Sequence, residues 1–177
     1  MAEKTDNKIR KRCISLFVEN EIGVLAYIAG LFSGKSYNLD SLTVGTTIDP
    51  TVSRMTISMT SDDQTFEQIT KQLNRSVPVI KVVDFTDADI FMKELMYLKV
   101  TDCDDGEMKK IADIAQKFDA TIIDCTSNNV LLECLQKEEN NDELLTLCKE
   151  NFGKRVEIVR GGGVAIEALE VAKKRKS

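Results

Sequence analysis

Residues 13–32 read CISLFVENEIGVLAYIAGLF, and their hydrophobic period changes halfway along. In residues 13–18 the side chains alternate, so that Ile14, Leu16 and Val18 face one side of a strand. From Val24 onward the apolar residues recur at helical spacing and predict one buried stripe: Val24, Leu25, Ile28, Leu31 and Phe32. The stretch therefore predicts a strand that turns into a helix at Gly23.

The elements that follow this stretch complete a β-α-β-β-α-β order. Further strands are expected at residues 39–47, 53–60 and 79–85, with a helix that begins at Asp62 or Asp63. The second half repeats the order, with strands at residues 94–101, 121–126, 130–135 and 155–160 and helices opened by Asp104 or Asp105 and by Asn141 or Asp142. We predict an α+β fold of two ferredoxin-like βαββαβ units, each an antiparallel sheet with its helices on one face.

The open face of the first predicted sheet carries small hydroxyl residues. Ser15, Thr43, Thr56 and Ser58 point away from the helices, and we expect them to be exposed in an isolated unit. They are either solvated or covered by a second copy, which would also protect a sheet edge. We favour an oligomer.

The composition excludes several classes of function. The 177 residues contain no histidine, which rules out Ser-His-Asp and Cys-His catalysis and His-bearing zinc sites. A net charge of −5 argues against nucleic-acid binding, and the basic run at residues 173–176 is expected to be a solvated tail. An RNA-recognition unit of this topology would stack bases on aromatic residues, but the third strand offers Arg54, Thr56 and Ser58. An enzyme based on carboxylates or cysteine would need a converging acid–base pair, which the sequence does not suggest.

The five cysteines do not form a metal or disulfide pattern. Their number is odd and they are widely spaced, and those in strand-like runs (Cys13, Cys125 and Cys134) are expected to act as small hydrophobic residues. This usage fits a reducing, cytoplasmic compartment. Residues 1–12 lack the apolar core of a signal peptide, and no apolar run reaches the ~18 residues of a membrane span. We expect no membrane association.

Two segments resemble binding motifs only superficially. Gly161, Gly162 and Gly163 follow the last predicted strand but lack the spacing of a phosphate loop, so we interpret them as a flexible connection to a terminal helix. The aspartates at residues 102, 104 and 105 lie at a strand-to-helix junction, where carboxylates cap the helix. We therefore expect neither phosphate nor metal at these places.

The turn between the first strand and helix is the strongest candidate site. The first helical turn leaves N–H groups without intrahelical acceptors, and these favour a carboxylate. Gly23 lets a ligand approach the backbone, and the Asn20 amide both donates and accepts hydrogen bonds. Ile22, Val24 and Leu25 could bound a small apolar pocket. The residues fit an α-amino acid, although an ordinary Asn-capped turn would look the same.

Four motifs carry a family resemblance. They are Glu19-Asn20-Glu21-Ile22-Gly23-Val24-Leu25, Gly30-Leu31-Phe32-Ser33, Tyr37-Asn38-Leu39-Asp40-Ser41-Leu42-Thr43-Val44 and Asp49-Pro50-Thr51-Val52-Ser53-Arg54-Met55-Thr56. In this combination the sequence closely resembles the regulatory small subunits of acetolactate synthase, also called acetohydroxyacid synthase. The resemblance is strong over residues 12–85 and rests on length and repeat architecture beyond them.

The resemblance implies a division of labour between the two units. Residues 12–86 would be an ACT domain that binds an effector and dimerises, and residues 90–172 the family's ferredoxin-like C-terminal domain. The chain would have no catalytic residues and no cofactor of its own. It would activate a large catalytic subunit, which carries thiamine diphosphate, Mg²⁺ and FAD, and would make that subunit sensitive to valine in branched-chain amino-acid biosynthesis.

The resemblance also implies where valine binds. Asn20, Gly23, Val24 and Leu25 would come from one protomer of a homodimer, and Asn38 and Leu39 from the other. The alternative is a free-standing ACT-domain sensor that regulates a different partner.

Overall fold

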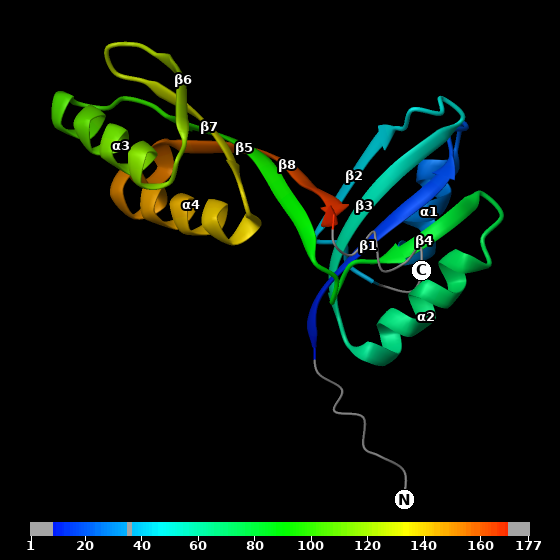
Figure 1. Ribbon diagram of the computed structural model, residues 1–177. Helices are drawn as coiled ribbons and strands as arrows, with labels where there is room; N and C mark the ends of the chain where they lie inside the picture. Colours follow the sequence, from blue (N-terminus) through cyan, green and yellow to red (C-terminus); the bar gives the residue numbers. More distant parts are fainter. Residues whose placement is uncertain (1–8, 35–36, 170–177) are drawn as a thin grey trace, which may run out of the picture. The chain divides into compact units, whose positions relative to one another are not determined.

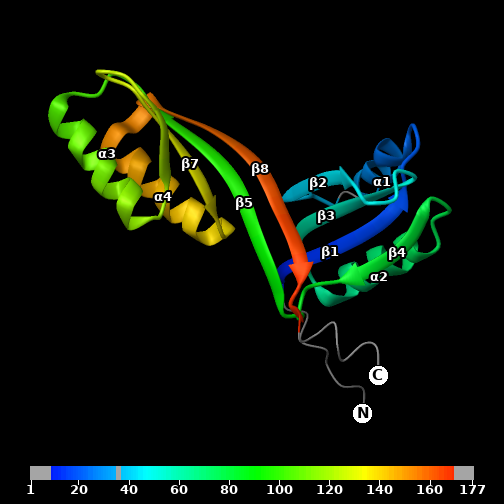
Figure 2. The same ribbon diagram turned by 45° about the horizontal axis from the view of Figure 1, so that its top comes forward.

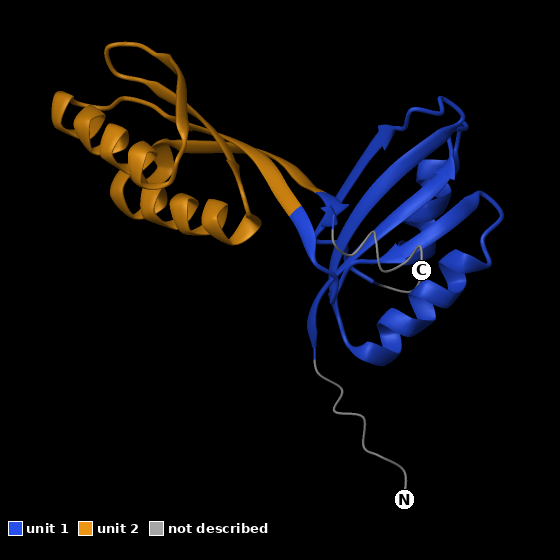
Figure 3. Ribbon diagram, in the orientation of Figure 1, with its two compact units in different colours: residues 1–91, 165–177 blue, residues 92–164 orange. Residues whose placement is uncertain are grey.

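The structure, a computed structural model, describes residues 9–34 and 37–169. The chain divides into two compact units, residues 1–91 with 165–177 and residues 92–164 (Figure 3). Each unit has an apolar core of its own. The terminal helix expected after the glycines and the basic run at residues 173–176 fall largely or wholly outside the described residues.

The first unit holds one four-stranded antiparallel sheet and two helices. Its elements are β1 (Arg10–Glu19), α1 (Val24–Ser33), β2 (Ser41–Thr46), β3 (Val52–Ser61), α2 (Asp63–Asn74) and β4 (Val79–Asp84). The strand order is β2-β3-β1-β4, and both helices lie on the same face (Figure 1, Figure 2). The central strands β1 and β3 are in register with Ile14 opposite Ile57. This is the predicted βαββαβ order.

The second unit repeats this arrangement. Its elements are β5 (Ile90–Val100), α3 (Asp105–Lys117), β6 (Thr121–Cys125), β7 (Val130–Gln136), α4 (Glu138–Phe152), a short 3₁₀ turn (Gly153–Arg155) and β8 (Val156–Glu167). The strand order is β6-β7-β5-β8. Two ferredoxin-like units are therefore confirmed.

The first core lies between the sheet and the two helices. Ile14, Leu16 and Val18 of β1 are fully buried, as the alternation predicts. On α1 the buried residues are Val24, Ile28 and Phe32, four residues apart. Leu25 does not belong to this stripe as predicted, because it lies about 100° around the helix and is 44% exposed.

Of the three helix starts predicted from capping residues, two are confirmed and one is wrong. Asp62 accepts a hydrogen bond from the Thr65 N–H, and Asp104 caps α3 together with Glu107. Helix α4, however, begins at Glu138 after Lys137, not at Asn141 or Asp142. Asn141 is fully buried inside the helix, where its amide donates to the Glu94 backbone carbonyl and carboxylate.

The prediction that the three glycines follow the last strand is wrong, because they lie inside it. Strand β8 continues from Val156 through the glycines to Glu167. Gly162 has a φ of +77°, a left-handed conformation that glycine adopts readily. The segment is extended backbone because β8 pairs with β5 and then enters the first unit at residue 165.

The open face of the first sheet is more buried than predicted. Ser15, Thr56 and Ser58 are at most 4% exposed, whereas Thr43 is half-buried. Larger groups lie on the same face. The Arg54 guanidinium donates from Nε to the Ser15 hydroxyl over 2.9 Å, and the Phe85 side chain is buried. We expected solvent or a second copy on this face, and cover by residues of the same chain was not predicted.

The cysteines are all free thiols. Cys134 is buried as predicted, but Cys125 is exposed because every residue of the short edge strand β6 is exposed. Burial raises the pKa of the Cys134 thiol to about 11. Across the described residues, no helix is long and apolar enough to cross a membrane.

Candidate functional site

The loop between β1 and α1 is braced by the turn that joins β2 to β3. The Asn20 N–H donates to the Thr51 carbonyl over 2.7 Å, and its side-chain amide donates to the Pro50 carbonyl over 2.9 Å. The Ser53 hydroxyl donates to Asn20 Oδ1 over 2.9 Å. One amide hydrogen and one lone pair of Asn20 are left for other partners. Asn20 therefore positions the loop and keeps capacity for a ligand.

Gly23 marks the point where the loop becomes a helix. It is the N-cap of α1, with a φ of +90°, and no heavy atom lies within 4 Å of the position that a Cβ would occupy. The first turn of α1 contains no acidic residue, so the N–H groups of Leu25 and Ala26 meet no carboxylate from this turn. This end of the helix is a backbone surface that suits an anion.

Apolar side chains surround this backbone surface. Val24 is buried against the core, whereas Leu25 is 44% exposed and Ile22 is completely exposed. An exposed isoleucine beside an open helix end costs free energy in a lone chain, since its apolar area stays in water. The loop therefore offers exposed apolar side chains beside the open backbone at Gly23.

The predicted site residues lie on two different segments of the chain. Asn20, Gly23, Val24 and Leu25 share the loop and first turn of α1. Asn38 and Leu39 lie on the segment that leads into β2, where Asn38 is exposed and Leu39 packs against the first core. Strand β2 is at the edge of its sheet, and an edge strand is a place where another chain can pair.

Residues 49–51 form the turn that their sequence predicts between β2 and β3, and they also support the loop at Asn20, which was not predicted. Asp49 accepts hydrogen bonds from the Thr51 N–H and hydroxyl over 2.9 and 2.7 Å, which lowers the pKa of its carboxyl. Thr51 and Pro50 in turn accept from Asn20. The Asp-Pro-Thr sequence is a turn signal that could have identified this support for the loop.

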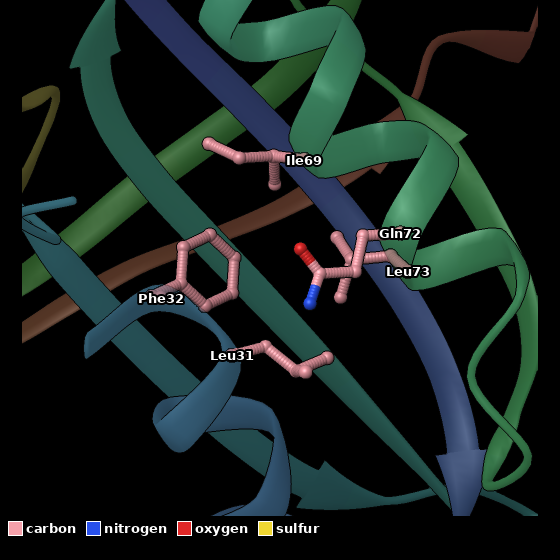
Figure 4. Close-up of a pocket in the computed structure, with 5 residues that line it drawn as sticks. All are labelled: Leu31, Phe32, Ile69, Gln72 and Leu73. Atoms are coloured by element: carbon pink, nitrogen blue, oxygen red, sulfur yellow. The ribbon is translucent and has the colours of Figure 1, made fainter. Parts of the chain in front are cut away.

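Two hollows in the described part of the first unit lie away from the loop at Gly23. The cavity between α1 and α2 is lined by Leu31, Phe32, Ile69, Gln72 and Leu73 (Figure 4) and has a volume of about 10 Å³, which is close to the limit for one water molecule. The other is a wide, open hollow beside Phe17, Thr46, Thr47, Ile48 and Arg54. The loop at Gly23 belongs to neither.

The acidic segment before α3 is a helix cap, as predicted. Asp104 accepts from the Glu107 N–H over 2.8 Å, and the Glu107 carboxylate accepts from the Asp104 N–H over 3.1 Å. Glu107 also forms a paired contact with Arg155. Within residues 9–34 and 37–169, no three His, Cys, Asp or Glu side chains are grouped to hold a metal ion.

Comparisons with known proteins place both units in one family. A family model described as "AHAS small subunit-like ACT domain" matches residues 14–81, and one described as "Small subunit of acetolactate synthase" matches residues 93–169. The chain is 37% identical over 162 residues to the acetolactate synthase small subunit of Haemophilus influenzae, a match that covers 90% of this chain and 97% of that protein. It is 34% identical to the small subunit of Buchnera aphidicola, over 89% of this chain and 98% of that protein.

A solved structure gives the same result. The crystal structure of the acetolactate synthase small subunit from Thermotoga maritima superimposes with a TM-score of 0.80, at 31% identity, and covers 90% of this chain and 98% of that chain. The match spans both units and extends over nearly the whole relative. The chain therefore belongs to the family of acetolactate synthase small subunits and is a regulatory, non-catalytic subunit.

Proposed function

We propose that this chain binds the large, thiamine-diphosphate-dependent subunit of acetolactate synthase, raises its activity and makes it sensitive to valine. The observation that supports this most is the open backbone at Gly23, where the first turn of α1 has no carboxylate of its own. A free amino acid supplies that carboxylate. Residues 12–86, within the first unit, would be the ACT domain that senses valine, and residues 90–172 would be the C-terminal domain.

Each part of valine has a suitable partner in the loop. Its carboxylate would accept hydrogen bonds from the N–H groups at the start of α1. Its ammonium would donate to the free lone pair of Asn20 Oδ1 and to the Asn38 amide of a second copy. Val24 and Leu25, with Leu39 of that second copy, would enclose the branched side chain. Discrimination against leucine and isoleucine would be modest, because one methylene is worth only ~1–3 kcal/mol.

A homodimer through the first unit would complete the site. Asn38 and Leu39 lie just before edge strand β2, and the strand carries Val44, which is 48% exposed. Pairing two copies along β2 would extend the sheet and bring both halves of the site together. Valine bound across two chains would stabilise one dimer geometry, and this shift in population is what the large subunit would detect.

The chain itself would hold no cofactor. Thiamine diphosphate, Mg²⁺ and FAD would stay with the large subunit, and the complex would work in the cytoplasm. The free thiols of the chain suit such a reducing compartment.

Reconstitution with the large subunit tests this function. Acetolactate formation would be measured with the large subunit alone, with this chain added, and with both in the presence of valine. We expect activation by this chain and inhibition by valine only when the chain is present. Isothermal titration of the chain alone would give the affinity for valine without any catalytic readout.

The same experiment separates the alternative, a free-standing ACT-domain sensor. Such a sensor would bind an amino acid but neither co-purify with the large subunit nor change its rate. Titration with leucine and isoleucine beside valine identifies the effector. Failure of all three to bind would contradict the proposed effector site, while activation alone would still support a regulatory subunit.

A further inference from the structure

Two consecutive residues of β3 make contacts on opposite faces of the first sheet. Ser53 donates its hydroxyl to Asn20 in the loop of the proposed effector site. Arg54, the next residue, donates from Nη2 to the backbone carbonyl of Ala165 over 3.1 Å, within the first unit. Because successive side chains of a strand point to opposite faces, this single step along β3 joins the loop to β8.

The Arg54 guanidinium is held in one orientation. Its Nε donates to the Ser15 hydroxyl over 2.9 Å, and its carbon lies 5.2 Å from the centre of the Phe17 ring and 5.8 Å from that of Phe85. A planar guanidinium that stacks on rings and donates in two directions is not replaced by an ammonium. The contact with Ala165 is therefore directed by geometry, beyond simple attraction of charge.

Ala165 of β8 and Ala168, just after the strand, both contact other residues of the first unit. Ala165 is only 3% exposed and accepts from Arg54, and the Ala168 N–H donates to the Asp89 carbonyl over 2.9 Å. Residues 156–164 of the same strand belong to the second unit, where β8 pairs with β5. Ala165 is therefore a residue of the first unit on a strand whose preceding residues belong to the second unit.

We propose that Arg54 is the positioning residue that couples the effector loop to β8. The inference rests on the proposed function and adds a route by which bound effector is sensed. An effector that orders the loop around Asn20 would also restrict the motion of Ser53, which donates a hydrogen bond to Asn20, and of the start of β3. Arg54 would then hold Ala165 more firmly, and the end of β8 would open less often.

Hydrogen exchange of the full chain, with and without valine, tests the coupling directly. In the wild type we expect slower exchange on adding valine at residues 19–27 and also at residues 160–169. In Arg54→Lys the loop should still be protected, with an unchanged valine affinity by titration, while the change at residues 160–169 is lost. Inhibition of the reconstituted enzyme should then weaken about fivefold or more.

A second variant controls for a general disturbance of the cations around the Phe17 ring. The Lys81 ammonium lies 5.8 Å from the centre of the same Phe17 ring, and Lys81→Gln should behave as wild type. If Arg54→Lys folds poorly, Ser15→Ala removes one guanidinium acceptor and should reduce the valine-dependent change at residues 160–169 in part. Unchanged coupling in Arg54→Lys, or equal loss in Lys81→Gln, would overturn the inference.

The two proposals fail in different ways. Protection of the loop by valine without any change at residues 160–169 in the wild type would overturn the coupling and leave the proposed function standing. Absence of valine protection anywhere in the wild type would contradict valine as effector, and the coupling with it.

Discussion

Gly23 adopts a left-handed backbone conformation at the point where the proposed effector would bind. Its φ of +90° favours glycine, and among other residues asparagine and aspartate tolerate this region best. These two side chains have almost the same size and differ in charge. The position therefore allows backbone strain to be separated from electrostatics.

We expect Gly23→Asp to weaken valine inhibition strongly, because its carboxylate would repel that of the effector. Gly23→Asn imposes the same strain and bulk without the charge, so its complex should be half-inhibited at a valine concentration about tenfold or more below that needed for Gly23→Asp. Activation of the large subunit should largely survive in both variants. The measurement is the valine concentration for half-inhibition of the reconstituted enzyme, and full inhibition in Gly23→Asp would refute the site.

The Glu107 carboxylate contributes to the stability of the fold at acid pH. Hydrogen bonds from Arg155 and from the Asp104 N–H lower the pKa of Glu107 from 4.5 to about 2. The folded state therefore favours the ionised carboxylate. This stabilisation is complete above the unperturbed pKa of 4.5 and is lost as the pH falls towards 2.

We predict that Arg155→Gln raises the pKa of Glu107 and flattens the loss of stability between pH 4.5 and pH 2. Carboxyl resonances followed by NMR give the pKa, and urea unfolding at several pH values gives the stability. Lys154→Gln, a neighbouring exposed position, serves as control. The same Glu107 titration in Arg155→Gln and in the wild type would show that the ion pair is not its cause.

At the scale of elements, helix α4 is joined to β5 through a buried polar contact. Asn141 donates to the Glu94 carboxylate, which also receives two hydrogen bonds from Arg160 over 2.9 and 2.6 Å. Burial alone would raise the pKa of Glu94, but these hydrogen bonds outweigh it and lower the pKa. The carboxylate is therefore charged and depends on its donors.

Asn141→Asp should destabilise the second unit by about 2–4 kcal/mol, since it removes one donor and adds a carboxylate beside Glu94. The adjacent Asn140 is exposed on the same helix, so Asn140→Asp provides a matched control with an effect within about 0.5 kcal/mol. Urea unfolding followed by circular dichroism measures both. Equal stability of the two variants would contradict the role given to this contact.

These elements also show which features follow from local sequence. The strands with alternating residues and the helices capped by Asp62 and Asp104 were predicted, because both signals depend on near neighbours in the chain. The start of α4 was missed because Lys137 has no side-chain cap, and Asn141, a typical capping residue, instead serves a contact with residue 94. Burial of Ser15 depends on Arg54, 39 residues away, which a local pattern does not reveal. The glycines inside β8 were missed for the same reason, because their strand is formed by pairing with β5, which is distant in the sequence.

The candidate site could be found in part for the same reason. The loop around Gly23 is local and was identified from a strand that changes into a helix. Its support from Pro50, Thr51 and Ser53 comes from a turn some 30 residues further on. The contribution of Asn38 and Leu39 depends on a second chain and stays a prediction.

For the whole molecule, the duplicated architecture gives two separate cores. Leu16 is fully buried in the core of the first unit and Leu98 in that of the second, at similar positions on central strands. Such cores can be destabilised one at a time, since mutations at distant sites with no shared partners act independently. The pair therefore tests whether the units unfold separately.

Truncating either leucine should destabilise its own unit by about 2–5 kcal/mol through lost burial and a cavity. We expect calorimetry of Leu16→Ala to lower one unfolding transition and Leu98→Ala to lower the other. Proteolysis and mass spectrometry during heating would identify which unit is released first in each variant. If both variants lower a single common transition, the units unfold as one cooperative body. The shared strand β8 would then couple the units energetically as well as covalently. A mutation in one unit would change the free energy of unfolding of the other.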